Sequence, residues 1–174
     1  MTKTVALRRP QTLGEEIANA ISHGSGVVLA AAGTAVMIYL ACAGAQGLAG
    51  AIIYGLSLTV LYTASCVYHA VRDKRLKKVL RVFDHCSIFL LIAGTYAPIT
   101  LVALRDSVGI PLFAIISACA LIGITCNIID LERFKKLSMV LYVVMGWMAL
   151  LAIKPLLEIS SPSQLALLVG GGLS

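Results

Sequence analysis

Charged side chains are scarce in this sequence of 174 residues. Lysine, arginine, aspartate and glutamate make up 13% of it, apolar residues make up 59%, and the mean hydropathy is +0.94. Water-soluble domains contain about 25% charged and about 45–50% apolar residues. A soluble fold of this size could not bury so much apolar side-chain surface. The composition therefore excludes that class and predicts a membrane protein.

The sequence also lacks a C-x-x-C pair, which would be typical of a redox or metal motif. Its five cysteines all lie in apolar segments, at Cys42, Cys66, Cys86, Cys119 and Cys126. Disulfides between membrane-buried thiols are not expected, so we interpret these residues as reduced, small packing side chains.

Long apolar runs divide the chain. A membrane-spanning helix needs roughly 20 mainly apolar residues. Five segments meet this requirement: Ser22–Ala43, Leu48–Val71, Val82–Leu104, Val108–Ile129 and Leu137–Leu157. A further run, residues 164–174, would extend only about 16 Å as a helix, so we expect the chain to end inside a sixth span. The predicted fold is an all-α, polytopic transmembrane helix bundle in one domain, residues 1–174, in which residues 1–21 form a cytoplasmic tail and an interfacial helix.

Lysine and arginine alternate between the predicted loops. The N-terminal tail has three of them, the first loop none, the second loop (72–81) six, the third loop one, the fourth loop (133–136) three and the fifth loop one. The positive-inside rule therefore places the N-terminus in the cytoplasm. This topology accounts for the net charge of +6, which consequently gives no reason to expect nucleic acid as a partner. Membrane lipid is the expected partner.

Polar residues gather near the span ends that this topology assigns to the cytoplasmic leaflet. Ser65 and His69 are four residues apart and share one face of the second predicted span. Asp84 and His85 open the third span at nearly the same depth. They are neighbours about 100° apart on a helix, so we expect only one of the two to face the bundle interior.

A second polar stripe precedes the first span. Glu16, Asn19 and His23 follow an i, i+3, i+7 pattern and share one helix face. Thr12 and Glu15 form a T-x-x-E capping box, which predicts the start of a short interfacial helix there. Asn19 and His23 have structural roles in the simplest interpretation.

Histidine, aspartate and serine at one depth are typical of a zinc site with an acid/base group. Catalytic zinc has three protein ligands and a water, and a carboxylate that does not bind the metal can deprotonate that water. His69 would be one ligand. Spacing alone makes His23 and His85 the obvious others, and His85 with Cys86 is a further candidate ligand pair.

Each candidate also has a simpler explanation. Asp84 could pair with Arg81 or another loop cation at the interface, where an ionisable group costs less than at the centre of a span. His69 could extend toward the headgroups. Ser65 could donate a hydrogen bond to the carbonyl four residues earlier in its own helix.

Three ordered motifs together resemble the bacterial hemolysin III family. They are E-x-x-N-x-x-x-H at Glu16–His23, S-x-x-x-H at Ser65–His69, and FDHCSIFLLIAGTYAPI from Phe83. That family is related to the progestin and adipoQ receptors and, more distantly, to alkaline ceramidases. The resemblance covers essentially the whole chain, and it implies seven spans with a cytoplasmic N-terminus.

The resemblance also implies a zinc site near the cytoplasmic leaflet. Relatives bind zinc through the histidine of the S-x-x-x-H motif and two histidines of an H-x-x-x-H motif on the seventh span. Carried over, His69 is a zinc ligand, Asp84 is the acid/base residue that orients the water, and Ser65 supports them. His23 and His85 are then not ligands. The sequence contains no H-x-x-x-H motif, so it holds one of three expected ligands.

Three functions follow as expectations. The first is zinc-dependent hydrolysis of a lipid amide or ester at the cytoplasmic leaflet of the bacterial plasma membrane. The second, suggested by the family name, is a pore-forming hemolysin, although the spans lack a polar stripe from one membrane face to the other. The third is a sensor of lipid or membrane state that zinc stabilises without catalysis. The sequence does not decide the oligomeric state, and a homo-oligomer stays open.

Overall fold

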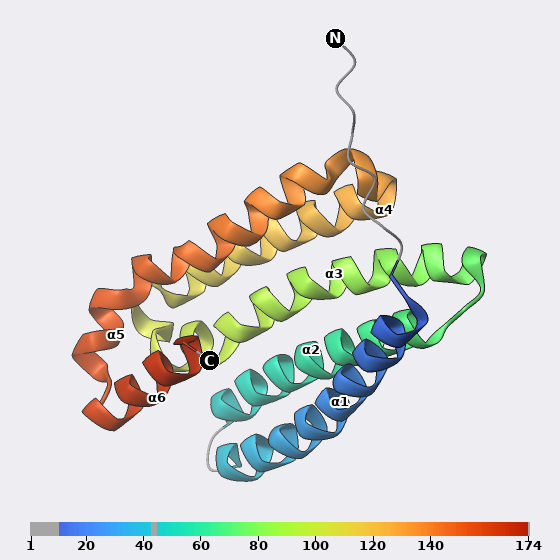
Figure 1. Ribbon diagram of the computed structural model, residues 1–174. Helices are drawn as coiled ribbons and strands as arrows, with labels where there is room; N and C mark the ends of the chain where they lie inside the picture. Colours follow the sequence, from blue (N-terminus) through green and yellow to red (C-terminus); the bar gives the residue numbers. More distant parts are fainter. Residues whose placement is uncertain (1–10, 43–44, 174) are drawn as a thin grey trace.

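The computed structural model describes residues 11–42 and 45–173, and their regular elements are all helices (Figure 1). The α-helices are α1 (Leu13–Ala41), α2 (Ala45–Ala70), α3 (Lys74–Pro98), α4 (Ile110–Trp147), α5 (Ile153–Ile159) and α6 (Pro162–Leu173). Two π-helical turns, η1 (Ile99–Ala103) and η2 (Arg105–Gly109), connect α3 to α4. One 3₁₀ segment, η3 (Met148–Ala152), connects α4 to α5. The all-α prediction is confirmed.

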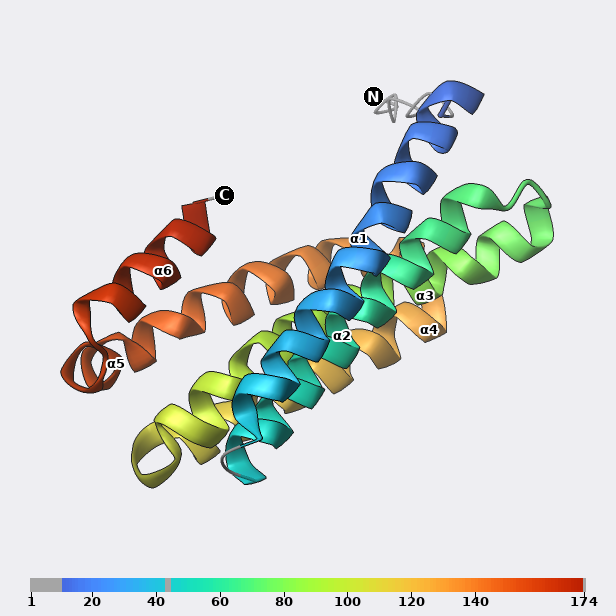
Figure 2. The ribbon, with the colours of Figure 1, turned by 90° about the horizontal axis from the view of Figure 1, so that it is seen from below.

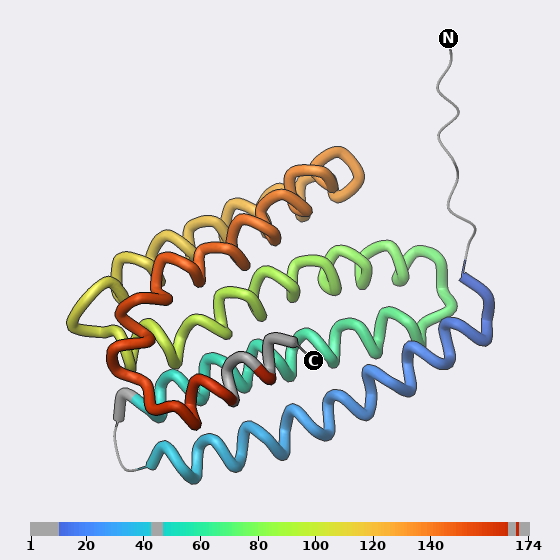
Figure 3. Tube along the Cα trace, turned by 60° about the vertical axis from the view of Figure 1, so that its left-hand side comes forward, coloured from blue at the N-terminus to red at the C-terminus, as the bar shows by residue number. Residues whose placement is uncertain are grey.

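The helices form an antiparallel bundle in chain order. Helix α1 packs on α2, α2 on α3, and α3 on α4. Helix α4 reverses direction at Asp130, whose φ of −162° and ψ of 97° are not helical, so its two limbs form a hairpin (Figures 1 and 2). The Ser138 hydroxyl donates to Asn127 Oδ1 across this hairpin, at 2.6 Å. The chain turns again at Ser160, and α6 follows (Figure 3).

Four segments of the described chain are long and apolar enough to cross a membrane: Leu13–Ala41, Gly47–Ala70, Lys74–Ala103 and Arg105–Ile159. The last has 55 residues and includes the reversal at Asp130. The fourth and fifth predicted spans are therefore its two limbs. Large apolar side chains such as Leu29 (72% exposed) and Ile129 (68% exposed) lie on the outside of the bundle, as a fold surrounded by lipid requires. The predicted membrane helix bundle is confirmed.

Two helix starts differ from the prediction. The Thr12–Glu15 capping box is present and begins α1 at Leu13, but the helix then continues unbroken to Ala41. The predicted interfacial helix is thus the first part of α1, because no proline interrupts residues 13–41. Most of the predicted basic loop 72–81 is also helical, since Asp73 caps α3 by accepting from the backbone N–H groups of Arg75 and Leu76. The predicted end of the first span, Ala43, lies outside the described residues.

The core lies between α3 and the two limbs of α4. Phe89, Ile116 and Met145 have no exposed surface, and the Tyr96 hydroxyl donates to the Met145 carbonyl at 2.6 Å. Phe89 also packs against Gly123, where an added Cβ would overlap the phenyl ring. These contacts fix α3 against the two limbs of α4 and so help to position the polar residues at its start.

Candidate functional site

One end of the bundle collects most of the positive charge. The start of α1, the end of α2, the start of α3 and the reversal of α4 all lie at this end, on the right of Figure 1. We call it the basic end. Its described lysines and arginines are Arg72, Lys74, Arg75, Lys77, Lys78, Arg81, Arg133, Lys135 and Lys136. The opposite end has Arg105 and Lys154. The residues that the sequence predicted to gather at one depth lie toward this end of their helices: His23 on α1, Ser65 and His69 on α2, and Asp84 and His85 on α3.

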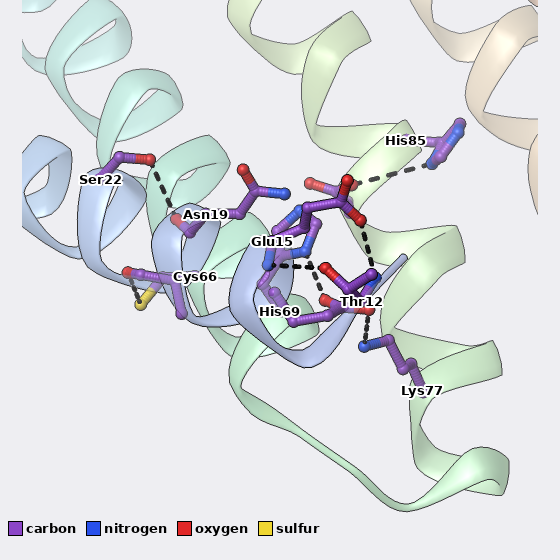
Figure 4. Close-up of polar contacts among 11 residues, drawn as sticks. Thr12, Glu15, Asn19, Ser22, Cys66, His69, Lys77 and His85 are labelled. Carbon is purple, nitrogen blue, oxygen red and sulfur yellow. Dashed lines mark hydrogen bonds and ion pairs between the residues drawn. The ribbon is translucent and has the colours of Figure 1, made fainter. Parts of the chain in front are cut away.

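A carboxylate at the basic end joins three helices. Glu16 on α1 contacts His69 on α2, with 2.7 Å between Oε2 and Nδ1, and Lys77 on α3, with 2.5 Å between Oε1 and Nζ (Figure 4). All three side chains are largely buried, with 17%, 10% and 25% exposed, respectively. The sequence stripe identified Glu16, but it gave no sign of these partners, and Lys77 was not among the predicted site residues.

This contact fixes the hydrogen-bonding state of His69. An ionised carboxylate only accepts hydrogen bonds, so Nδ1 of His69 must donate to Glu16. In the neutral ring, Nε2 then holds the free lone pair. A histidine that binds a metal commonly donates its other ring N–H to a carboxylate in this way, which sets the tautomer and the orientation of the ring.

Close packing of α1 on α2 brings Glu16 to His69. The Cys66 thiol donates to the Ala20 carbonyl at 3.3 Å, and a Cβ on Gly24 would lie 3.4 Å from the Cys66 sulfur. Glycine at this level therefore allows the two helix backbones to approach each other.

His23 lies beside His69 on this interface. The ring centroids are 5.7 Å apart and the rings are nearly perpendicular, at 76°. Its Nδ1 is buried, and it has no hydrogen-bond partner among the described residues. The Tyr62 ring, 6.1 Å from the His23 ring, completes the aromatic contact. His23 is thus close to the candidate ligand, although the resemblance gives it no role in binding zinc.

Ser65 and Asp84 are both sheltered from solvent. Ser65 is 4% exposed and lies one turn before His69 on α2. The Asp84 side chain is 17% exposed, and its one ion pair among the described residues is with Nδ1 of His85, at 3.9 Å. Arg81, the partner suggested by the simpler explanation, instead contacts Glu132 at 2.6 Å. The Asp84 carboxylate therefore keeps acceptor capacity.

His85 and Cys86 are directed elsewhere. Nδ1 of His85 donates to the Arg81 carbonyl at 2.9 Å, and Figure 4 shows the ring pointing away from His69. The Cys86 sulfur faces the Ile124 carbonyl. Within residues 11–42 and 45–173 no three His, Cys, Asp or Glu side chains lie together so that they could hold a metal ion. The structure therefore does not assemble the set of His23, His69 and His85 that spacing alone suggested.

The comparison with known proteins shows which family the chain belongs to. The family model described as Haemolysin-III related matches residues 11–174. The chain belongs to the hemolysin III family. It is 40% identical over 170 residues to "Hemolysin-3" of Bacillus cereus, which covers 95% of this chain and 77% of the relative. It is 39% identical over 164 residues to "Hemolysin-3 homolog" of Bacillus subtilis (strain 168), which covers 93% of this chain and 77% of that relative. No solved structure matches it.

A cavity of about 530 Å³ opens beside His69 in this hemolysin III protein. Its polar and charged lining residues are Gln11, Glu16, His69, Arg72 and Lys77. Apolar residues of α1, such as Ile17 and Ile21, line the rest. The cavity thus combines charged groups at the basic end with an apolar wall, as a site for an amphipathic molecule requires.

The residues present fit one ligand of the zinc ion that the family resemblance implies. His69 meets the requirements of chemistry and orientation, because its Nδ1 is held by Glu16 and its Nε2 is left free to bind. Three protein ligands are the usual number at a catalytic zinc. Among the described residues, His69 is the one candidate for such a ligand at this position.

Proposed function

We propose that this hemolysin III protein is a zinc-dependent hydrolase of lipid amides or esters, with its site at the cytoplasmic leaflet. The observation that supports this most directly is the buried Glu16–His69 contact, which leaves Nε2 of His69 free beside a cavity. When bound, zinc would supply a Lewis acid that polarises a carbonyl group and acidifies a water.

The orientation of the site follows from the charges. Nine described lysines and arginines lie at the basic end and two at the opposite end. The positive-inside rule assigns the basic end to the cytoplasm. The Bacillus relatives support a bacterial plasma membrane as the location.

Asp84 is the proposed acid/base residue. Its carboxylate is mostly buried, and its one described ion pair, with His85, is long at 3.9 Å, so it is free to accept a hydrogen bond from the attacking water. It takes the proton of that water as a general base and later returns it to the leaving amine or alcohol. Ser65, one helical turn from His69, is the proposed positioning residue for the imidazole or for the developing oxyanion.

Glu16 and Lys77 have a supporting role in this proposal. Glu16 keeps Nδ1 of His69 protonated, and Lys77 holds the second carboxylate oxygen of Glu16 in place. The two contacts fix the direction of the carboxylate, so that the His69 ring is oriented before any ligand arrives.

The test compares Asp84→Asn with Asp106→Asn in a chain that includes the H-x-x-x-H segment of the family. Asp106 lies in η2, at the opposite end of the bundle, and serves as the matched control. Vesicles containing an N-acyl sphingoid lipid or a fluorescent lipid ester provide the substrates, and released fatty acid is measured by mass spectrometry. We expect Asp84→Asn to lower the rate about 10²–10⁴-fold and Asp106→Asn to leave it unchanged. Full activity in Asp84→Asn contradicts the proposal.

The same preparations distinguish the two alternatives. The names of the relatives suggest a pore-forming hemolysin as one alternative. Such a protein would release dye from vesicles without forming any lipid product. A zinc-stabilised sensor would lose stability on zinc removal and would yield neither product nor dye release.

A further inference from the structure

A long apolar groove runs along the outer face of α3 at the basic end. Its larger part has a volume of about 670 Å³. Its walls come from three helices and include Val60 and Ala64 of α2, Lys78, Phe83 and Leu90 of α3, and Ile128 of α4. A second part of about 450 Å³ lies between α2 and α3 and shares Val60, Ala64 and Phe83 with the first. We call the two parts together the outer groove.

Phe83 divides this groove. It belongs to the lining of both parts, together with Val60 and Ala64, and its side chain is 62% exposed. Two adjacent apolar channels therefore border one protruding aromatic ring. This arrangement suits a molecule with two hydrocarbon chains, one on each side of Phe83.

The dimensions agree with one leaflet of a bilayer. The larger channel extends on α3 from Lys78 to Leu90, about 18 Å along the helix at 1.5 Å per residue. Half of the hydrocarbon core of a bilayer is about 15 Å thick. A chain lying in the groove would thus run from the membrane surface to the middle of the bilayer.

Lys78 supplies a cation at the surface end of the groove. It is the one charged residue among the described residues that line the two channels. Its neighbours on α3 have acidic partners, Lys77 with Glu16 and Arg81 with Glu132. Within the described part of the chain, Lys78 has no such partner, so its ammonium group is available to an external anion.

We propose that the outer groove binds an anionic diacyl phospholipid, with its phosphate at Lys78 and its two acyl chains on either side of Phe83. Lipids of the surrounding bilayer supply the acyl chains that fill the groove. The unpaired ammonium group of Lys78 favours a lipid with a negatively charged headgroup. None of the lining residues belongs to the Glu16, His69 and Asp84 site, so this lipid is not the substrate. The proposal goes beyond the proposed hydrolase and holds whether or not the protein binds zinc.

Native mass spectrometry of the purified protein provides the test. The probes are phosphatidylglycerol and phosphatidylcholine with the same acyl chains, together with inorganic phosphate. We expect phosphatidylglycerol to bind more tightly than phosphatidylcholine and phosphate alone not to compete with it. Each lysine near a membrane surface contributes about 1 kcal/mol of attraction to anionic lipid, which is about fivefold in affinity.

Two substitutions have matched controls. Lys78→Gln should weaken phosphatidylglycerol binding about fivefold, whereas Lys74→Gln, on an exposed lysine of the same helix outside the groove, should change it less than about twofold. Ala64→Phe should fill the groove and abolish the preference, whereas Ala32→Phe on the exposed face of α1 should not. Thermal unfolding of all four variants identifies any that fail to fold.

Three results would overturn the proposal. Equal affinity for the two lipids would show that the headgroup charge is not recognised. An equal loss in Lys74→Gln and Lys78→Gln would show diffuse attraction to the basic end. Unchanged binding in a folded Ala64→Phe protein would place the lipid outside the groove.

Discussion

Replacing Glu16 by glutamine removes the charge that links three helices and leaves the side-chain shape unchanged. In the native chain the two carboxylate oxygens accept hydrogen bonds from Nδ1 of His69 and Nζ of Lys77. The amide of glutamine has one acceptor oxygen and one donor nitrogen. Its oxygen can therefore accept a hydrogen bond from either His69 or Lys77. Its NH₂ group, itself a donor, must then face the remaining N–H donor.

The magnitude follows from this loss. A hydrogen bond to a charged group contributes about 1.5–3 kcal/mol to stability. Since Glu16, His69 and Lys77 are each no more than 25% exposed, solvent replaces the lost contact poorly. We expect Glu16→Gln to lower the free energy of unfolding by about 1.5–3 kcal/mol. Glu132→Gln is the control, because Glu132 is 63% exposed in its pair with Arg81 and should cost less than about 1 kcal/mol.

Two assays measure the effect. Equilibrium unfolding in mixed detergent micelles gives the free energies, and ¹⁵N NMR of labelled histidine reports the tautomer of His69. We expect the neutral ring of His69 in the native protein to carry its proton on Nδ1, and Glu16→Gln to show a mixture of the two tautomers. Unchanged tautomer populations, or a stability loss no larger than that of Glu132→Gln, would refute the role assigned to Glu16.

Two further predictions concern the packing that supports the site. Gly123→Ala should lower the free energy of unfolding by about 1–3 kcal/mol, because the new methyl group overlaps the fully buried Phe89 ring. Gly146→Ala is the control and should not destabilise the protein, because a methyl group added there meets no heavy atom within 4 Å apart from its chain neighbours and its own helix backbone. Equal stability of the two variants in micelle unfolding would contradict the packing described here. Ser138→Ala removes the hydroxyl that donates to Asn127, a residue with no exposed surface. It should lower the free energy of unfolding by about 1–3 kcal/mol in the same assay. An unchanged free energy would mean that the α4 hairpin does not depend on this bond.

The membrane bundle could be predicted from the sequence because hydropathy and segment length determine it. The reversal at Asp130 also follows from the sequence, since charged residues interrupt two apolar runs there. The helix boundaries were less predictable. Hydropathy alone predicts a loop for the basic segment after Asp73, because it contains no information on helix caps. In the structure Asp73 caps α3, and the segment is helical.

The candidate site was predictable only where its residues share a helix. The S-x-x-x-H spacing places Ser65 and His69 on one face of α2. Glu16, by contrast, lies 53 residues from His69 and 61 from Lys77 along the chain. No periodicity connects residues at such separations, because their contact depends on how closely α1, α2 and α3 pack. The outer groove has the same origin, since its walls come from three helices.

Zinc content measured by elemental analysis tests the central claim most directly. The measurement compares the 174-residue chain with a chain that includes the H-x-x-x-H segment, each with and without His69→Ala. We expect one zinc per protein in the longer chain and loss of that zinc in His69→Ala. Zinc retained by the longer His69→Ala chain would contradict the assignment of His69 as a ligand. Zinc bound by the 174-residue chain would mean that its own three histidines complete a site, and the assignment of the remaining ligands would then be wrong.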